Sequence, residues 1–182
     1  MLTNKMKKTK ESGMTLIETL IVITVGLVIV ALALTVYGSV RDKNNVRNET
    51  ENLSLIYNQT MDLFSGEELT DDFDIAKAVE MGIVPQKMKI LGTGAGATVR
   101  NAWGGAVTVE GESPSTLTLT TARVPAGNVC IELVRNQAKV GWTHYDVGGK
   151  GTAFEDMTVS VLSTNCSGSG TKTIEFKYDS TF

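Results

Sequence analysis

Residues 13–40 read GMTLIETLIVITVGLVIVALALTVYGSV, and the 22 residues from Thr19 to Val40 carry no charge. A helix of this length rises about 1.5 Å per residue and spans roughly 33 Å, which is enough to cross a bilayer. Glu18 lies at the start of the apolar stretch. A carboxylate in hydrocarbon costs about 2.5–3.5 kcal/mol, so an ionisable residue there is by default a functional candidate. The stretch predicts a membrane-spanning helix in which the Glu18 carboxylate needs a positively charged partner.

A short basic leader precedes this stretch. The first 13 residues contain four lysines and one glutamate, and the positive-inside rule places such a segment in the cytoplasm. The apolar run is longer than the core of an ordinary secretory signal, and no small-x-small site closes it before Arg41. The N-terminal segment is therefore expected to hold the chain in a membrane.

The helix is expected to continue beyond the apolar run. Residues 41–45 are polar but contain no helix breaker, and Gly66 is the first stop signal. Between them, residues that suit a buried face recur at helical spacing. These residues are Val46, Leu53, Ile56, Tyr57, Thr60 and Phe64. We predict one helix from about Thr15 to Phe64, apolar all round in its first half and amphipathic in its second.

The remaining chain predicts an α+β head in which this long helix packs on a mostly antiparallel sheet of about five strands. A short helix is expected over Phe73–Met81, with Asp71 or Asp72 as its N-cap and Gly82 as its stop. A second helix is expected over Val129–Ala138. Alternating patterns predict strands at Ala106–Glu110, Thr116–Arg123, Val140–Val147, Met157–Leu162 and Thr173–Tyr178.

Charge and motifs argue against several classes of site. After residue 13 the chain holds 13 of its 17 basic and 19 of its 20 acidic residues, which does not favour a nucleic-acid-binding surface. The glycine-rich segment 91–96 lacks the Gly-Lys-Ser/Thr ending of a phosphate-binding loop and predicts a connection. The acids around residues 67–74 lack the order of an EF-hand, so a solvated loop is favoured over a calcium site. No cofactor or metal is predicted.

Catalytic residues are also hard to assemble. The chain contains one histidine, His144, within an alternating run that predicts a strand surface rather than a catalytic base. Cys130 and Cys166 have no CxxC spacing, so a zinc site is not favoured. In an exported domain such a pair suggests a disulfide, and two buried free thiols are the alternative. We predict no enzymatic activity and no catalytic residues.

The junction Gly13–Met14, with Glu18 and an apolar helix behind it, resembles the class III signal of type IV prepilins and pseudopilins. This resemblance implies that prepilin peptidase cuts after Gly13 and that Met14 becomes the methylated N-terminus. It also implies that Glu18 neutralises the terminal amine of a neighbouring subunit during assembly.

The head resembles the type IVb pilins. The features that carry this similarity are Asn101-Ala102-Trp103-Gly104-Gly105, a cysteine on a helix before Gly141-Trp142, and a second cysteine before the final strand. The resemblance implies a disulfide between Cys130 and Cys166 that closes a surface-exposed region of the pilus. It implies four segments: a cleaved leader (1–13), an apolar membrane and assembly helix (14–40), the amphipathic half of that helix (41–65) and the head (66–182).

The implied function is that of a structural subunit of a type IVb-like pilus that supports adhesion, aggregation or conjugative mating. Its expected partners are further copies of itself in a helical filament, prepilin peptidase and the assembly machinery of the inner membrane. The precursor is expected in the inner membrane of a Gram-negative bacterium and the product in an extracellular pilus. Two alternatives stay open: a pseudopilin of a type II secretion system, and a signal-anchored periplasmic enzyme or binding protein.

Overall fold

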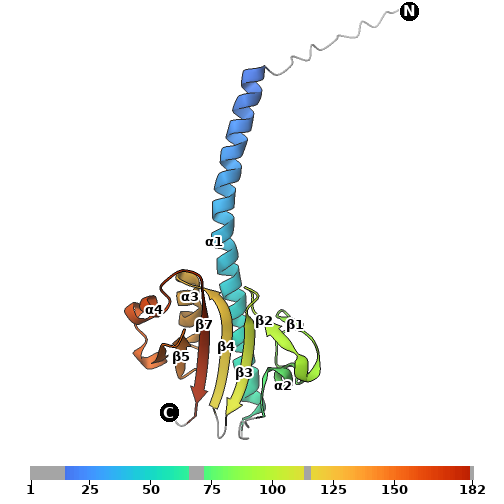
Figure 1. The fold of residues 1–182 in the computed structure, drawn as a ribbon, viewed down its shortest axis with the longest axis vertical. Helices are drawn as coiled ribbons and strands as arrows, with labels where there is room; N and C mark the ends of the chain where they lie inside the picture. Colours follow the sequence, from blue (N-terminus) through green and yellow to red (C-terminus); the bar gives the residue numbers. More distant parts are fainter. Residues whose placement is uncertain (1–14, 66–71, 113–115, 181–182) are drawn as a thin grey trace, which may run out of the picture. The chain divides into compact units, whose positions relative to one another are not determined.

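A computed structural model describes residues 15–65, 72–112 and 116–180. The first element is the helix α1 (Leu16–Leu63), which confirms the long helix predicted from the sequence (Figure 1). The chain divides into two compact units, residues 1–40 and 41–182.

The first unit contains the apolar part of α1. Its large apolar side chains are exposed, and Leu16 and Leu34 have 84% and 67% of their surface accessible. The hydroxyls of Thr19, Thr24 and Ser39 donate to backbone carbonyls three residues earlier, at 2.9, 2.9 and 3.0 Å, which satisfies them within the helix. Among the described residues, α1 is long and apolar enough to cross a membrane.

The second unit is built on an antiparallel sheet of seven strands in the order β1-β2-β3-β4-β7-β5-β6. The three longest strands, at the centre of this order, are β3 (Ala106–Glu112), β4 (Thr116–Pro125) and β7 (Thr171–Asp179). The outer strands are β1 (Lys89–Leu91), β2 (Thr98–Arg100), β5 (His144–Val147) and β6 (Gly151–Ala153). The sheet has two more strands than expected, because β1, β2 and β6 were not predicted and the strand predicted over Met157–Leu162 does not form.

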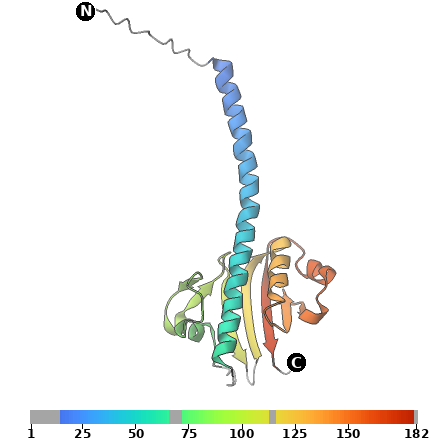
Figure 2. The ribbon, with the colours of Figure 1, turned by 180° about the vertical axis from the view of Figure 1, so that it is seen from behind.

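The second half of α1 and helix α3 (Asn128–Gln137) cover one face of this sheet (Figure 2). Figure 1 shows the opposite face of β3, β4 and β7, over which no helix lies. The burial of β3 alternates accordingly, since Val107 and Val109 are buried and Thr108 and Glu110 are not. This alternation gives the sheet one apolar and one polar face.

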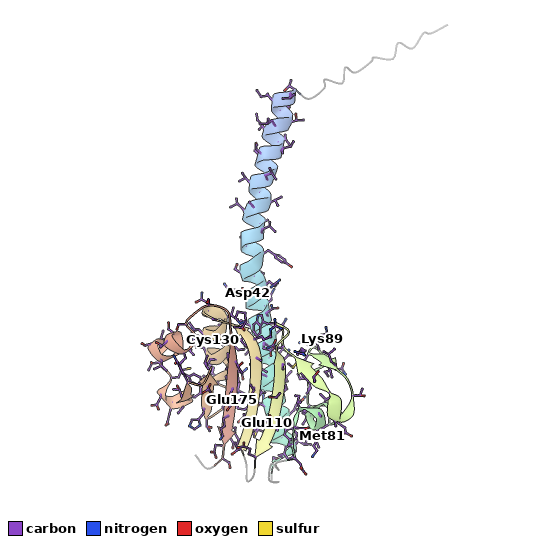
Figure 3. All side chains as sticks on the ribbon, in the orientation of Figure 1. Asp42, Met81, Lys89, Glu110, Cys130 and Glu175 are labelled. Atoms are coloured by element: carbon purple, nitrogen blue, oxygen red, sulfur yellow. A yellow bond between two sulfur atoms is a disulfide. The ribbon has the colours of Figure 1, made fainter. Side chains whose placement is uncertain are left out.

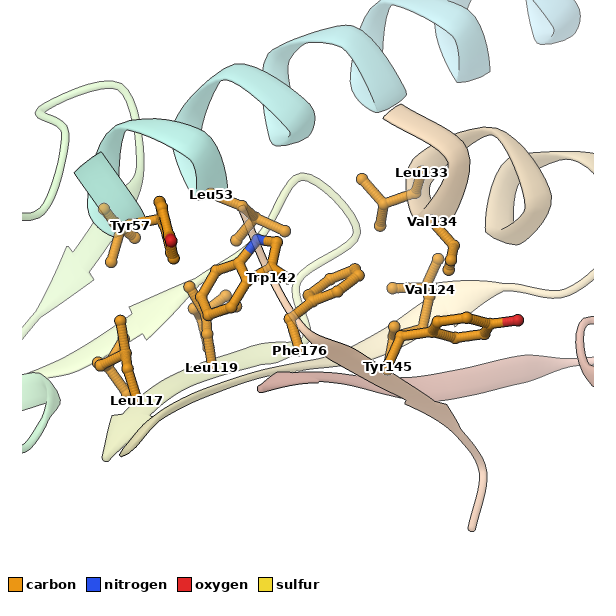
Figure 4. Packing of buried hydrophobic residues seen from close by; sticks show 14 of the residues in the cluster. Leu53, Tyr57, Leu117, Leu119, Val124, Leu133, Val134, Trp142, Tyr145 and Phe176 are labelled. Atoms are coloured by element: carbon orange, nitrogen blue, oxygen red, sulfur yellow. The ribbon is translucent and has the colours of Figure 1, made fainter. Parts of the chain in front are cut away.

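The core lies between the sheet and these helices (Figure 4). Leu53 and Tyr57 project from α1 into it, and Phe176 projects from β7. The Trp142 ring lies between the two elements, with its centroid 4.5 Å from that of Tyr57 and 5.8 Å from that of Phe176. Aromatic pairs at such separations add to the free energy gained from burial alone.

Polar side chains fix α1 to the segment after α3. Gln137 is fully buried, accepts a 3.0 Å hydrogen bond from Trp142 Nε1 and donates to the Thr50 carbonyl, also at 3.0 Å. The Tyr57 hydroxyl donates to the Gly141 carbonyl at 3.2 Å. These bonds satisfy polar groups that would be costly to bury alone and set the position of α1 along the head.

Gly141→Ala is expected to destabilise the head by about 2 kcal/mol, because a Cβ there would lie 2.6 Å from the Tyr57 hydroxyl and Gly141 has φ of 123°. Gly149→Ala is the matched control, since Gly149 also has positive φ but an added Cβ would meet no other atom within 4 Å. Urea unfolding measures both. An equal loss in the two variants would show that the contact with Tyr57 has no role.

Three local predictions were wrong. Residues 157–162 do not form a strand; helix α4 (Val159–Asn165) begins there, and the Thr158 hydroxyl caps it by accepting from the Val161 N–H at 3.2 Å. The predicted strand over Val140–Val147 contains only β5 in its second half. Helix α2 (Ile75–Glu80) takes Asp74 as its N-cap, not the preceding aspartates, with a 2.8 Å bond from the Lys77 N–H. The short helices η1 (Gly94–Gly96) and η2 (Phe154–Asp156) complete the elements.

Candidate functional site

Glu18 lies in the first turn of α1 and is exposed. A negative charge in the first turn of a helix interacts favourably with the helix dipole. The ion pairs among the described residues are Lys77–Asp72 and Lys87–Glu51, so Glu18 takes part in neither. Gly13 and Met14, the predicted cleavage site, lie outside the described residues.

Cys130 and Cys166 form a disulfide, with their Cα atoms 5.7 Å apart, and both are fully buried. The bond joins α3 to the residue that follows α4. Next to it, the Gly127 N–H donates to the Cys166 carbonyl at 2.8 Å and the Ala126 N–H donates to the Gly170 carbonyl at 3.0 Å. The disulfide expected from the pilin resemblance therefore joins α3 to the end of α4, and the two backbone hydrogen bonds hold the residues before α3 against those between α4 and β7.

The segment Asn101–Gly105 forms a tight turn between β2 and β3. The Asn101 carboxamide accepts from the N–H groups of Trp103 and Gly105 at 3.0 and 2.7 Å, and it donates to the Thr121 hydroxyl at 2.9 Å and the Ala122 carbonyl at 2.6 Å. A Cβ at Gly105 would overlap the Ala122 carbonyl. Glycine is therefore required where this turn meets β4.

This turn covers a buried acid that the sequence did not reveal. Glu49, in the head part of α1, is fully buried, and its Oε2 accepts from the Ala102 N–H at 3.2 Å. Its Oε1 has no hydrogen-bond partner among the described residues. Burial raises the pKa of Glu49 from 4.5 to about 7, and the bond from Ala102 opposes this rise only in part.

The raised pKa of Glu49 predicts a pH-dependent stability. The folded head binds a proton at Glu49 more tightly than the unfolded chain does, so protonation of Glu49 stabilises the fold. This stabilisation is complete below about pH 4.5 and is lost as the pH rises to about 7. At about 1.4 kcal/mol per pKa unit, the free energy of unfolding falls by about 3 kcal/mol over this pH range. Urea unfolding at a series of pH values should show this slope in the native head and not in Glu49→Gln. The exposed acid Glu132 gives the control Glu132→Gln, and a native slope in Glu49→Gln would contradict the prediction.

The one histidine of the chain lies on a strand, as the sequence predicts. His144 is half-buried at the start of β5, and its Nδ1 lies 3.0 Å from the Thr143 hydroxyl oxygen. Within the described ranges, no group of three His, Cys, Asp or Glu side chains could hold a metal ion. Trp103 is partly buried and packs against the core, in agreement with a structural role at its turn.

Comparison with known families decides the class of the protein. A family model for the prokaryotic N-terminal methylation motif matches residues 8–34, and the model described as PilS N terminal matches residues 43–178. The chain belongs to the PilS pilin family. The methylation motif spans Gly13, Met14 and Glu18, and the PilS match spans the head and its disulfide. This pilin is a structural subunit of a pilus, and its family and fold are structural rather than enzymatic.

Solved structures show that the pilin has the type IVb fold. The crystal structure of the type IV b pilin from Salmonella typhi matches with a TM-score of 0.58 and 22% identity over 72% of this chain and 98% of that chain. The NMR structure of the type IVb pilin PilS from Salmonella typhi matches with a TM-score of 0.50 and 22% identity over 73% and 95% of the two chains. A comparison with curated proteins gave no match.

Proposed function

We propose that this pilin is cleaved between Gly13 and Met14 and polymerises through the apolar part of α1 into an extracellular type IVb-like pilus. The observation that carries the proposal is the exposure of this part of the helix, from Leu16 to Val40, within its own chain. Such a surface needs lipid before assembly and other copies of the helix afterwards, because water solvates it poorly.

Glu18 supplies the specific contact in this proposal. Cleavage after Gly13 creates a new amine at Met14, and the Glu18 carboxylate of one subunit pairs with the methylated amine of its neighbour. Two opposite charges removed from water are costly singly and less costly together, so the pair favours one axial offset between adjacent helices.

The proposal divides the chain into four functional segments: a cleaved leader (1–13), an assembly helix (14–40), the amphipathic half of that helix (41–65) and a surface head (66–182). Prepilin peptidase and an inner-membrane assembly machinery process and extract the subunit in a Gram-negative bacterium. Adhesion, aggregation and conjugative mating are functions of the assembled surface.

Mass spectrometry of the N-terminus tests the processing step. In cells with prepilin peptidase, the chain is expected to begin at Met14 with one added methyl group. In cells that lack the peptidase, it should retain the leader. An N-terminus at Met1 in both strains would overturn the proposal, and it would favour a signal-anchored protein instead.

A further inference from the structure

A polar groove of about 640 Å³ lies between the head part of α1 and helix α3. Its walls are side chains of these two helices: Lys43, Asn44, Arg47, Thr50 and Glu51 from α1, and Glu132 and Asn136 from α3. The Asn136 carboxamide donates to the Thr50 hydroxyl at 3.4 Å, which joins the two walls. Cys130, two residues before Glu132, is labelled in Figure 3. The groove belongs to the second unit, and its volume is within the range of ligand sites.

The α1 wall contains two cations without an ion-pair partner. Lys43 and Arg47 are exposed, and neither takes part in the ion pairs found among residues 15–65, 72–112 and 116–180. They are four residues apart on one helix, a spacing at which like charges destabilise it. Phosphate oxygens are frequent partners of such side chains, because the hydrogen bonds are strengthened by opposite charge. This wall therefore favours a ligand with a phosphate group.

The α3 wall contains an acid that also lacks an ion-pair partner. Glu132 is exposed and takes part in neither ion pair of the described segments. The other acid of the groove, Glu51, lies 3.4 Å from the ammonium of Lys87, which compensates its charge. A ligand with negative charge alone would leave Glu132 uncompensated. The groove therefore favours a ligand that carries a phosphate and a positively charged hydrogen-bond donor.

The groove starts near the end of the apolar part of α1. Lys43 is three residues after Val40, and three residues extend over at most about 11 Å in any direction of the chain. The headgroup layer on each side of a bilayer is about 5–7 Å thick, so the Lys43 ammonium can reach it. Residues 41–47 carry three cations and one acid on the opposite side of the predicted span from the basic leader, where the positive-inside rule disfavours cations. A lipid phosphate is therefore an available partner for them.

We propose that this groove binds the headgroup of phosphatidylethanolamine in the membrane that holds the precursor. The phosphodiester pairs with Lys43 and Arg47, and the ammonium pairs with Glu132. Phosphatidylglycerol has the phosphodiester but no cation for Glu132, and the trimethylated nitrogen of phosphatidylcholine has no N–H to donate. This inference rests on the membrane span of the proposed function, but not on leader cleavage or polymerisation.

Native mass spectrometry of the full-length chain tests the headgroup preference. The protein is released from micelles that contain phosphatidylethanolamine, phosphatidylglycerol and phosphatidylcholine in equal amounts and with identical acyl chains. Protein with one bound phosphatidylethanolamine should be at least about fivefold more abundant than protein with either other lipid, because only this headgroup pairs with both walls. Equal abundances, or a preference for phosphatidylglycerol, would overturn the proposal.

Substitutions in the groove test its two contacts separately. Lys43→Gln and Arg47→Gln should each weaken the binding of all three lipids about fivefold, since the phosphodiester is common to them. Glu132→Gln should remove the preference for phosphatidylethanolamine over phosphatidylcholine and retain lipid binding. Lys150→Gln and Glu155→Gln change exposed residues outside the groove and should leave binding and preference unchanged. An unchanged lipid pattern in Lys43→Gln or in Glu132→Gln would contradict the assignment.

Two further measurements identify the source of the headgroup and test the membrane span. Soluble phosphoethanolamine, which lacks the acyl chains, should not displace the lipid when added in excess, and displacement would overturn the assignment to a membrane lipid. Co-flotation with vesicles of phosphatidylcholine alone should occur for the native chain and for every variant, because the apolar helix is unchanged. Failure of the native chain to float would overturn the proposed membrane span as well, whereas flotation without headgroup preference would overturn this inference alone.

Discussion

Glu18→Ala is expected to enter the membrane and lose its leader normally, yet yield at least about tenfold fewer filaments, which corresponds to about 1.4 kcal/mol of assembly free energy. Glu18 carries the only charge between residues 15 and 40. In the proposed pairing, its removal leaves the amine of a neighbouring Met14 without a counter-charge in an apolar surrounding, and an uncompensated buried charge is strongly unfavourable. Filaments sheared from cells and quantified against total subunit provide the measurement.

Asp62→Ala is the matched control, because Asp62 is an exposed acid on the same helix but lies in its amphipathic half, outside the apolar part. This variant should assemble normally. Leader cleavage in both variants is followed by the mass of the subunit, which separates an assembly defect from a processing defect. Native filament yield from Glu18→Ala would contradict the charge pairing, although polymerisation through the apolar helix would still stand.

Replacing both Cys130 and Cys166 by serine is expected to lower the stability of the head by about 4 kcal/mol. The disulfide closes a loop with a sequence separation of 36 residues, and its loss restores the freedom of that loop in the unfolded chain. Urea unfolding followed by tryptophan fluorescence is suitable, because Trp142 is buried in the core that this region adjoins.

Reduction of the native chain controls for the effect of the serine side chains and should produce a similar loss. The stability is compared in the same detergent, so that the apolar helix contributes equally to each sample. A loss below about 1 kcal/mol in both experiments would show that packing, rather than the covalent link, holds α3 against α4.

The sequence predicted the elements whose pattern is continuous. Helix α1 follows from an unbroken apolar run and the later spacing of Leu53, Ile56 and Tyr57. The alternation over Ala106–Glu110, Thr116–Arg123 and Thr173–Tyr178 predicted strands that fall within β3, β4 and β7. In these elements, local preference and burial favour the same structure, which is when sequence patterns are informative.

The wrong predictions concern segments whose secondary structure is determined by tertiary contacts. Residues 157–162 alternate as a strand would, but the Thr158 cap starts α4 and Leu162 is its buried apolar residue. Strands β1, β2 and β6 have three residues each, too few for any periodic signal. They form because a neighbouring strand provides hydrogen-bond partners, as β3 does for β2 and β2 does for β1.

The buried acid was missed for a related reason. An acid on an amphipathic helix is ordinarily assigned to the solvent side, and the sequence around Glu49 contains no contrary signal. Its burial depends on the Asn101–Gly105 turn, more than 50 residues later in the chain, which brings the Ala102 N–H to its carboxylate. Glu18, in contrast, was recognisable because its apolar neighbours are adjacent in sequence.

The short outermost strands affect how this protein can associate with other copies of itself. An open sheet edge can recruit the backbone of another copy and start amyloid-like aggregation. The edges of this sheet are β1 and β6, each three residues long, with Lys89 on the first and Lys150 immediately before the second. Each edge therefore presents little unpaired backbone to another copy, and the lysine on or beside it further opposes edge-to-edge pairing.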